Sequence, residues 1–431
     1  MAEGTTHVLL PNEAELLIQS LDVSNLESLG SKKWWSRHDI IEKLNIQAVV
    51  NASSNTDEFV KEFCISHNKV ITLIYDLLVS ELWTEEIFPC IKERINMEKS
   101  TLPVYMALFH EATVVGLLET MLYYKEACEA AGDAIIDLID FVNRKLTKLL
   151  LKQEKPKKTH NENDDLMFQH ESIQFTIYMK SLSILRYISD SIECLPLSAL
   201  TRILNVHDIP CLLVNILDTS PWKRINEKGN PEIYNDNKWC SVEKDEQHLL
   251  SKLQGQVWLT LYQLLMHPEA QRKYEFNTSR KTQILKLRRY LNEVLLDQLP
   301  CLTDLQRFLE HLAVMEPPMT KRDLVIEQMP EIRSKLQEKY RGKWKNIAGK
   351  QAQEYFTLSD HEMKEHAQRL ASTYNLDVLE SLLDEPPVCA NCHSEAMKRC
   401  SSCQNEWYCS RPCQVQHWSK HKQLCKMLSK P

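Results

Sequence analysis

The sequence predicts a mainly α-helical protein that ends in a small metal-binding module. Three observations support this prediction. Only eight of the 431 residues are glycine, so few turns that need a positive φ angle are expected. Apolar residues recur at helical spacing through most of the chain up to about residue 315. Half of the fourteen cysteines lie between residues 389 and 425, close enough to share metal ions.

Residues 12–150 form the first predicted helical region. Between residues 107 and 122 the apolar side chains keep mostly to one helix face, and Glu111 is expected at the edge of that face. Pro103 stands where a proline could start this helix. A second pattern of the same period runs through residues 134–150. We therefore expect successive amphipathic helices in this region.

Residues 151–166 are mostly polar and charged, and they predict an exposed loop or linker. Helical patterns resume in the second region, residues 167–315. Two of its segments, 209–217 and 256–265, are apolar nearly all round, as inner helices of stacked helical repeats are. Residues 223–247 between them predict a polar loop. These features favour an armadillo-like helical solenoid, although no similarity recurs at a fixed period.

Residues 319–385 are more charged and predict less buried helices, which could carry the C-terminal module away from the solenoid. His361 and His366 flank a glutamate, as the ligands of a metalloprotease helix do, but they are separated by about 140° around a helix and do not easily share one zinc ion. The sequence contains neither a phosphate-binding glycine loop nor a nucleophile-elbow motif. We therefore predict that the protein is not an enzyme.

The segment 389–425 carries seven cysteines and one histidine at the spacing of metal ligands. They are Cys389, Cys392, Cys400, Cys403, Cys409, Cys413, His421 and Cys425. Two C-x2-C pairs, one C-x3-C and one H-x3-C provide two sets of four soft donors, which indicates two Zn²⁺ ions. Because each ion would have four protein ligands, both zinc ions are expected to be structural. A disulfide knot is the alternative, but it needs an oxidising compartment, and residues 1–13 lack the pattern of a signal peptide.

The charge of this segment argues against nucleic acid as a partner. Five basic side chains and two zinc ions balance two acidic side chains and seven thiolates, so the loaded segment is formally neutral. The whole chain has a net charge of −7 and a pI near 6.1, and no apolar run approaches the length of a membrane-spanning helix. We expect a cytoplasmic protein without nucleic acid or membrane contacts.

The run from Cys409 to Lys422, with Trp407 and Tyr408 before it and Cys425 after it, resembles the MYND-type zinc finger. The resemblance implies a cross-brace ligand order. The first zinc ion would take Cys389, Cys392, Cys409 and Cys413, and the second would take Cys400, Cys403, His421 and Cys425. It also implies a shallow groove for short proline-containing peptides, at the positions of Gln414 and Trp418. Trp418 could instead do no more than pack over a zinc site.

Segments in the helical regions and in the finger extend the likeness to most of the chain. They are residues 252–258, 295–300, 341–344 and 398–409. Together they resemble a family of MYND-containing assembly factors of motile cilia. The resemblance implies a non-enzymatic adaptor or co-chaperone-type factor for the cytoplasmic preassembly of axonemal inner and outer dynein arms. The implied partners are a leucine-rich-repeat dynein assembly factor, heat-shock chaperones and co-chaperones, and dynein arm chains as clients. The implied location is dynein assembly foci, centriolar satellites or the apical cytoplasm of ciliated cells.

Two other classes of MYND protein are the alternatives. One is a nuclear transcriptional corepressor adaptor, which a basic import signal would favour, and no such signal is found. The other is a lysine methyltransferase, in which the finger interrupts a SET domain. The sequence on both sides of this finger lacks the glycine-rich cofactor loops and the Asn-His segment of that domain.

Overall fold

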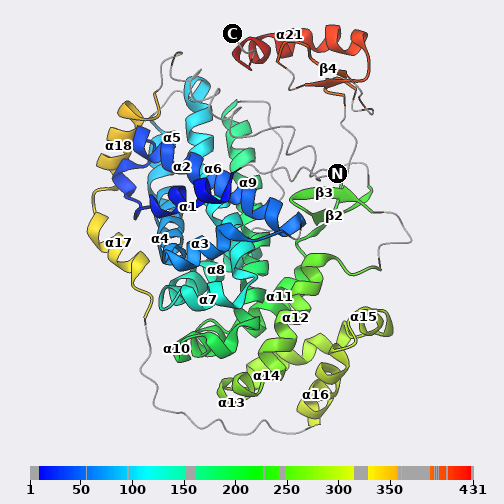
Figure 1. Cartoon of the computed structure of the whole chain (residues 1–431). Helices are drawn as coiled ribbons and strands as arrows, with labels where there is room; N and C mark the ends of the chain where they lie inside the picture. Colours follow the sequence, from blue (N-terminus) through cyan, green and yellow to red (C-terminus); the bar gives the residue numbers. More distant parts are fainter. Residues whose placement is uncertain are drawn as a thin grey trace.

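Helices make up most of the described chain, which confirms the predicted mainly α class (Figure 1). The computed structural model describes residues 9–54, 56–94, 97–151, 162–226, 229–242, 248–314, 329–357, 361, 389–392, 394, 396, 398–403 and 406–428. Residues 152–161 of the predicted linker and His366 lie outside the described residues. The solenoid arrangement of the helices remains a prediction.

The first helices run from residue 11 to residue 151. They are α1 (Pro11–Gln19), η1 (Leu26–Ser28), α2 (Lys32–Ser54), α3 (Phe59–Ser66), α4 (Lys69–Leu82), η2 (Trp83–Ile87), α5 (Phe88–Lys92), α6 (Met97–Leu122), α7 (Lys125–Ala130) and α8 (Ala134–Leu151). Pro11 stands in the first turn of α1, where the missing N–H has no helical partner to lose. Pro89 stands in α5, which continues directly from the π-helix η2. Pro103 does not start a helix as expected but lies inside α6. Packing of α6 against α2, α4 and α9 stabilises this long helix despite the lost hydrogen bond.

The second set of helices runs from residue 162 to residue 314. They are α9 (Glu162–Asp190), η3 (Ile192–Cys194), α10 (Leu197–Thr201), η4 (Arg202–Val206), α11 (Ile209–Thr219), α12 (Lys252–Met266), α13 (Pro268–Lys273), α14 (Thr278–Leu285), η6 (Lys286–Arg289), α15 (Glu293–Gln298) and α16 (Leu302–Val314). Ser251, Asn277 and Asn292 cap α12, α14 and α15, because each side chain accepts a hydrogen bond from the backbone N–H three residues further on. Helix α9 packs against α6, α8 and α12 and so joins the two sets.

The predicted polar loop 223–247 contains a small antiparallel sheet, so that expectation was wrong. Its strands are β1 (Lys223–Ile225), β2 (Pro231–Asn235) and β3 (Lys238–Ser241), in the order β1-β2-β3. Asp236 and Asn237 form the turn between β2 and β3 with φ angles of 44° and 63°, which suits a two-residue hairpin. Phe175 of α9 contacts the rings of Tyr234 and Trp239 and attaches the sheet to the helices.

The described part of residues 319–385 folds back onto the N-terminal helices and does not lead away from them (Figure 1). It forms α17 (Ile332–Tyr340) and α18 (Trp344–Glu354), which we call the strap, residues 329–357. The carboxylate of Asp137 in α8 accepts hydrogen bonds from the backbone N–H groups of Glu331 and Ile332 and so caps α17. Gln351 of α18 is fully buried, and its side chain bonds Trp83 Nε1 at 2.9 Å and the carbonyl of Leu26 at 2.8 Å.

Buried apolar side chains from α1 to the strap form one contiguous core, and those of the finger form a second. The central part of α6, Thr101–Leu122, is long and apolar enough to cross a membrane, but 78% of its apolar window is buried inside the protein. The bent pair Leu197–Val206 and Ile209–Thr219 also passes this test when it is taken as one span. Such burial is what the core helix of a folded domain shows.

A cluster of charges lies within this core, and the apolar periodicity of the helices did not predict it. Glu111, expected at a helix edge, has 0% exposure, and its carboxylate lies 2.5 Å from Nζ of Lys145. Glu81 of α4 bonds Arg144 at 2.6 Å and also meets Arg333 of the strap at 3.2 Å. The cluster therefore links α4, α6, α8 and α17 by ion pairs whose carboxylates are fully buried.

Candidate metal centres

The finger is built on a two-stranded sheet and one helix. These elements are β4 (Lys398–Arg399), β5 (Trp407–Tyr408) and α21 (Arg411–Leu428), drawn at the red end of the chain in Figure 1. The backbone N–H of Ala390 donates to the carbonyl of Trp407, and that of Cys400 donates to the carbonyl of Glu406. The first C-x2-C turn is thereby held beside β5, and the second lies in the connection between β4 and β5. Each turn brings two sulfur atoms close to ligands of α21, and the first also lies close to Cys409 before that helix.

The first tetrad consists of Cys389, Cys392, Cys409 and Cys413, and all four donor atoms lie within 4.8 Å of one another. The Sγ atom of Cys392 is 3.4 Å from that of Cys409 and 3.8 Å from that of Cys413. Tetrahedral thiolates around zinc are separated by about 3.8 Å, given a Zn–S bond of about 2.3 Å. The sulfur spacing therefore fits one zinc ion.

The second tetrad consists of Cys400, Cys403, His421 and Cys425, again within 4.8 Å. The Sγ atoms of Cys400 and Cys425 are 3.8 Å apart, and Nε2 of His421 lies 3.4 Å from Sγ of Cys403. Nε2 is therefore the histidine atom that faces the shared site. Both tetrads are the sets that the family resemblance implied, and within the described residues no other group of three or more such side chains is close enough to share an ion.

Backbone donors favour the thiolate form at two of the ligands, Cys389 and Cys400. Burial by itself would raise the pKa of the Cys389 thiol, but hydrogen bonds from backbone N–H groups, including that of Cys409, lower that pKa to about 6. Burial opposes the same effect at Cys400, where the backbone N–H groups of Cys403 and Ser402 lower the pKa to about 6. Thiolate, not thiol, is the form that binds zinc.

Geometry and donor chemistry thus fit two structural zinc ions in the finger. When bound, each ion would cross-link two distant parts of the segment and supply folding free energy that so small a core cannot provide. All four donors of each tetrad come from the protein, which is the composition of a structural site and not of a catalytic one.

The residues expected to bind peptides lie on the first two turns of α21. Gln414 is half-buried and directly follows the ligand Cys413, while Trp418 is 40% exposed and meets the ring of His421 edge-on at 5.9 Å. Trp418 therefore both contacts a zinc ligand and offers a free apolar surface. Val415 is 67% exposed beside them and was not anticipated from the sequence. An apolar residue three positions before Trp418 is a signal that could have found it.

A second group of titratable side chains lies deep in the helical core. Nδ1 of His38 is 2.8 Å from Nδ1 of His110, and Nε2 of His110 is 3.2 Å from the carboxylate of Asp76. Burial, and then the nearby His110, hold the pKa of His38 well below its ordinary value despite the opposing charge of Asp76. All three side chains are fully buried, so the arrangement offers no access to a substrate.

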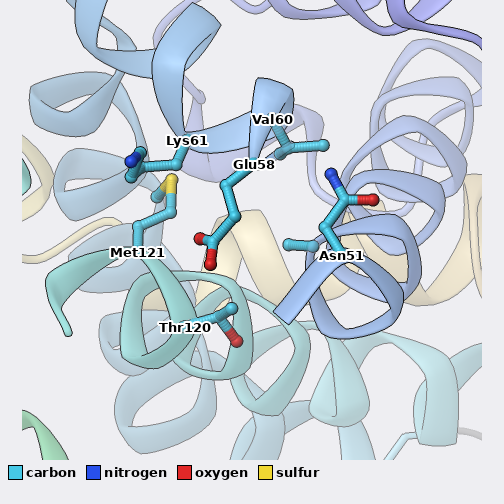
Figure 2. A pocket seen from close by; sticks show the side chains of 7 residues that line it. Asn51, Glu58, Val60, Lys61, Thr120 and Met121 are labelled. Atoms are coloured by element: carbon cyan, nitrogen blue, oxygen red, sulfur yellow. The ribbon is translucent and has the colours of Figure 1, made fainter. Parts of the chain in front are cut away.

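The described residues also outline two hollows. Figure 2 shows a narrow one between α2, α3 and α6, where the Glu58 carboxylate points toward Thr120 and the Lys61 amino group turns away from it. A shallow groove of about 360 Å³ lies over β1, β2 and Val242. The Thr120 hydroxyl donates to the carbonyl of Gly116 and not to Glu58, whose carboxylate accepts from the hydroxyl of Tyr124.

Comparisons with known proteins identify the finger and a relative that matches nearly the whole chain. The model of the MYND finger family matches residues 389–425. The chain is 31% identical over 448 residues to a zinc finger MYND domain-containing protein 10 homolog from Drosophila melanogaster, and the match covers 96% of this chain and 98% of the relative. It is also 53% identical over 38 residues to ubiquitin C-terminal hydrolase 15 from Oryza sativa subsp. japonica, which is 9% of this chain and 4% of that protein. No solved structure matches the chain.

Proposed function

Because the chain belongs to the zinc finger MYND domain-containing protein 10 family, we propose that it is a non-enzymatic adaptor for the cytoplasmic preassembly of axonemal inner and outer dynein arms. The single observation that carries this proposal is the length of the match. The likeness to the fly relative includes the helical body, by which we mean the helices from α1 to the strap, as well as the finger. The likeness to the plant hydrolase spans only 38 residues. The proposal therefore concerns the whole chain and not the finger alone.

In this proposal the finger captures a short peptide of one partner. The start of α21 supports it, because Gln414, Val415 and Trp418 place one polar side chain and two exposed apolar side chains together. An aromatic side chain next to a polar donor and acceptor suits a proline-containing segment, whose extended conformation loses little entropy on binding. The zinc-bound framework of the finger would hold the surface formed by these side chains in its binding conformation before the peptide binds.

The helical body holds the second partner, and the adaptor raises the local concentration of the two. We propose an armadillo-like arrangement of residues 167–315 for this scaffold, supported by the buried apolar faces of α11 and α12. The proposed partners are a leucine-rich-repeat dynein assembly factor, heat-shock chaperones and co-chaperones, and dynein chains as clients. The proposed place of action is cytoplasmic assembly foci of ciliated cells, without nucleic acid or membrane contacts.

Affinity capture from the cytosol of multiciliated cells tests the proposal. The wild-type chain and Trp418→Ala are compared after metal analysis has established that both hold two zinc ions. Lys420→Ala is the matched control, because Lys420 is exposed on the same helix about 200° away from Trp418. We expect Trp418→Ala to lose the chaperones and the assembly factor, and Lys420→Ala to keep them. Capture of transcriptional corepressors in their place, or of no dynein-assembly component by the wild type, would refute the proposal.

A further inference from the structure

The two tetrads differ in how far solvent reaches their sulfur atoms. All members of the second tetrad are buried, with 8% exposure at Cys403 as the largest value. In the first tetrad Cys389 is fully buried, but Cys392 is exposed, and the two remaining cysteines are partly exposed. Three ligands of the first tetrad are therefore at least partly exposed to solvent, whereas all four ligands of the second tetrad are buried.

Cys392 is the most exposed cysteine of the finger, and its sulfur atom has a close neighbour. Its Sγ lies 3.4 Å from Sγ of Cys409, which is partly exposed as well. The neighbouring hydroxyls of Ser394 and Ser410 lie 3.5 Å and 3.7 Å from these two sulfur atoms and leave the approach polar. Oxidants attack sulfur atoms that have thiolate character and are open to solvent, and a nearby second sulfur favours a disulfide product.

We propose that the first tetrad is an oxidation site, at which a peroxide joins Cys392 to Cys409 and the first zinc ion is lost while the second tetrad keeps its ion. The Cys392 thiolate attacks one oxygen of the peroxide and breaks the O–O bond, which yields a sulfenic acid and hydroxide. The Cys409 thiolate then attacks the sulfenic sulfur, forms the S–S bond and releases a second hydroxide. Two protons convert the hydroxides into water, so two thiolates are oxidised and one peroxide is reduced.

The oxidation has a consequence for the start of α21. Cys413 anchors the first turn of this helix in the first tetrad, and the side chain of Asn391 donates to Gln416 at 2.9 Å. Loss of the ion removes the first of these two attachments, directly beside Gln414. This step rests on the proposed function, because it predicts that peroxide ends peptide capture while His421 and its tetrad keep the rest of the finger folded.

The test uses the full chain loaded with two zinc ions and treated with hydrogen peroxide. A chromogenic chelator measures released zinc, and mass spectrometry of proteolytic fragments identifies disulfides. We expect one zinc ion per chain to be released about tenfold faster than the other, together with a Cys392–Cys409 disulfide. A thiol reductant with added zinc should restore two ions per chain.

Two matched variants locate the site. Cys392→His keeps four nitrogen and sulfur donors in the first tetrad but removes the attacking thiolate, so the fast release should disappear. Cys403→His makes the same exchange in the second tetrad and should leave the fast release unchanged. Release of both ions at one rate, a first disulfide within the second tetrad, or a fast phase that persists in zinc-loaded Cys392→His would each overturn the proposal. Disulfide mapping of the wild type decides the question even where a variant fails to bind zinc, and none of these readouts depends on peptide capture.

Discussion

Replacement of Lys145 by methionine should destabilise the helical body more than most single changes do. The ammonium group of Lys145 is 1% exposed and lies 2.5 Å from Glu111, which has no exposed surface. Although burial by itself would lower the pKa of Lys145, the charges of Glu111 and Glu81 raise it above its ordinary value, so the pair is ionic. Lys145→Met leaves the Glu111 carboxylate buried without its cation, which costs about 3–5 kcal/mol. Glu81 is spared, because Arg144 and Arg333 still contact it.

Urea unfolding of the zinc-loaded chain, followed by far-ultraviolet circular dichroism, measures this change. The double variant Lys145→Met/Glu111→Gln removes both charges, and its amide still accepts hydrogen bonds, so its unfolding free energy should return to within about 1–2 kcal/mol of the wild type. Lys148→Met is the control on the same helix, since Lys148 is 42% exposed and its partner Glu85 retains Arg333, and it should cost less than about 1 kcal/mol. The reasoning fails if Lys145→Met costs no more than this control, or if Glu111→Gln does not rescue it.

Three further predictions concern the strap, the finger and the response to acid. Gln351→Leu should destabilise the helical part of the chain by about 2–4 kcal/mol, because it leaves buried Trp83 Nε1 without a partner and removes the side-chain donor to the Leu26 carbonyl, and hydrogen exchange should rise first in residues 329–357. His421→Ala should unfold the finger and lose zinc by metal analysis, whereas Trp418→Ala should keep both ions; equal zinc loss in the two variants would contradict the ligand assignment. Burial by itself would raise the pKa of Asp140, but hydrogen bonds and charges from His207 and Arg202 lower that pKa from 3.8 to about 2. This carboxylate therefore stabilises the fold above its unfolded pKa, and the contribution is lost as the pH falls from about 4 to 2. Asp140→Asn should flatten the acid unfolding curve in that window, and an unchanged slope would count against the ion pair.

Short-range patterns predicted what depends on short-range physics. The zinc ligands follow from C-x2-C and H-x3-C spacing, because one tight turn or one helical turn places two donors on the same side. Helix α8 follows from apolar periodicity for a similar reason. The sequence left two alternatives for Trp418, peptide binding or packing over a zinc site. The structure is compatible with both, since its ring contacts His421 and remains partly exposed.

Features that depend on distant partners escaped prediction. Glu111 looked like an exposed edge residue, because the cation that allows its burial comes from another helix 34 residues away. The sheet in residues 223–241 lacks long apolar strands and is held by Phe175 of α9, so its polar sequence suggested a loop. The charged segment that forms the strap has one buried face, seen at Leu336 and Tyr340, but its docking surface is formed by the first ninety residues and Asp137.

Because the strap packs against the N-terminal helices, these helices cannot complete their packing during translation until the strap has been synthesised. Trp83 leaves the ribosome long before Gln351, its partner 268 residues later in the chain, has been made. At about 5–20 residues per second the nascent chain therefore spends tens of seconds with this indole and the Asp137 cap site uncovered. A chain truncated before residue 329 would lack the strap permanently, and it would keep exposed an apolar surface of the kind that chaperones bind. Loss of the last quarter of the protein would therefore leave the helices of its first third incompletely packed.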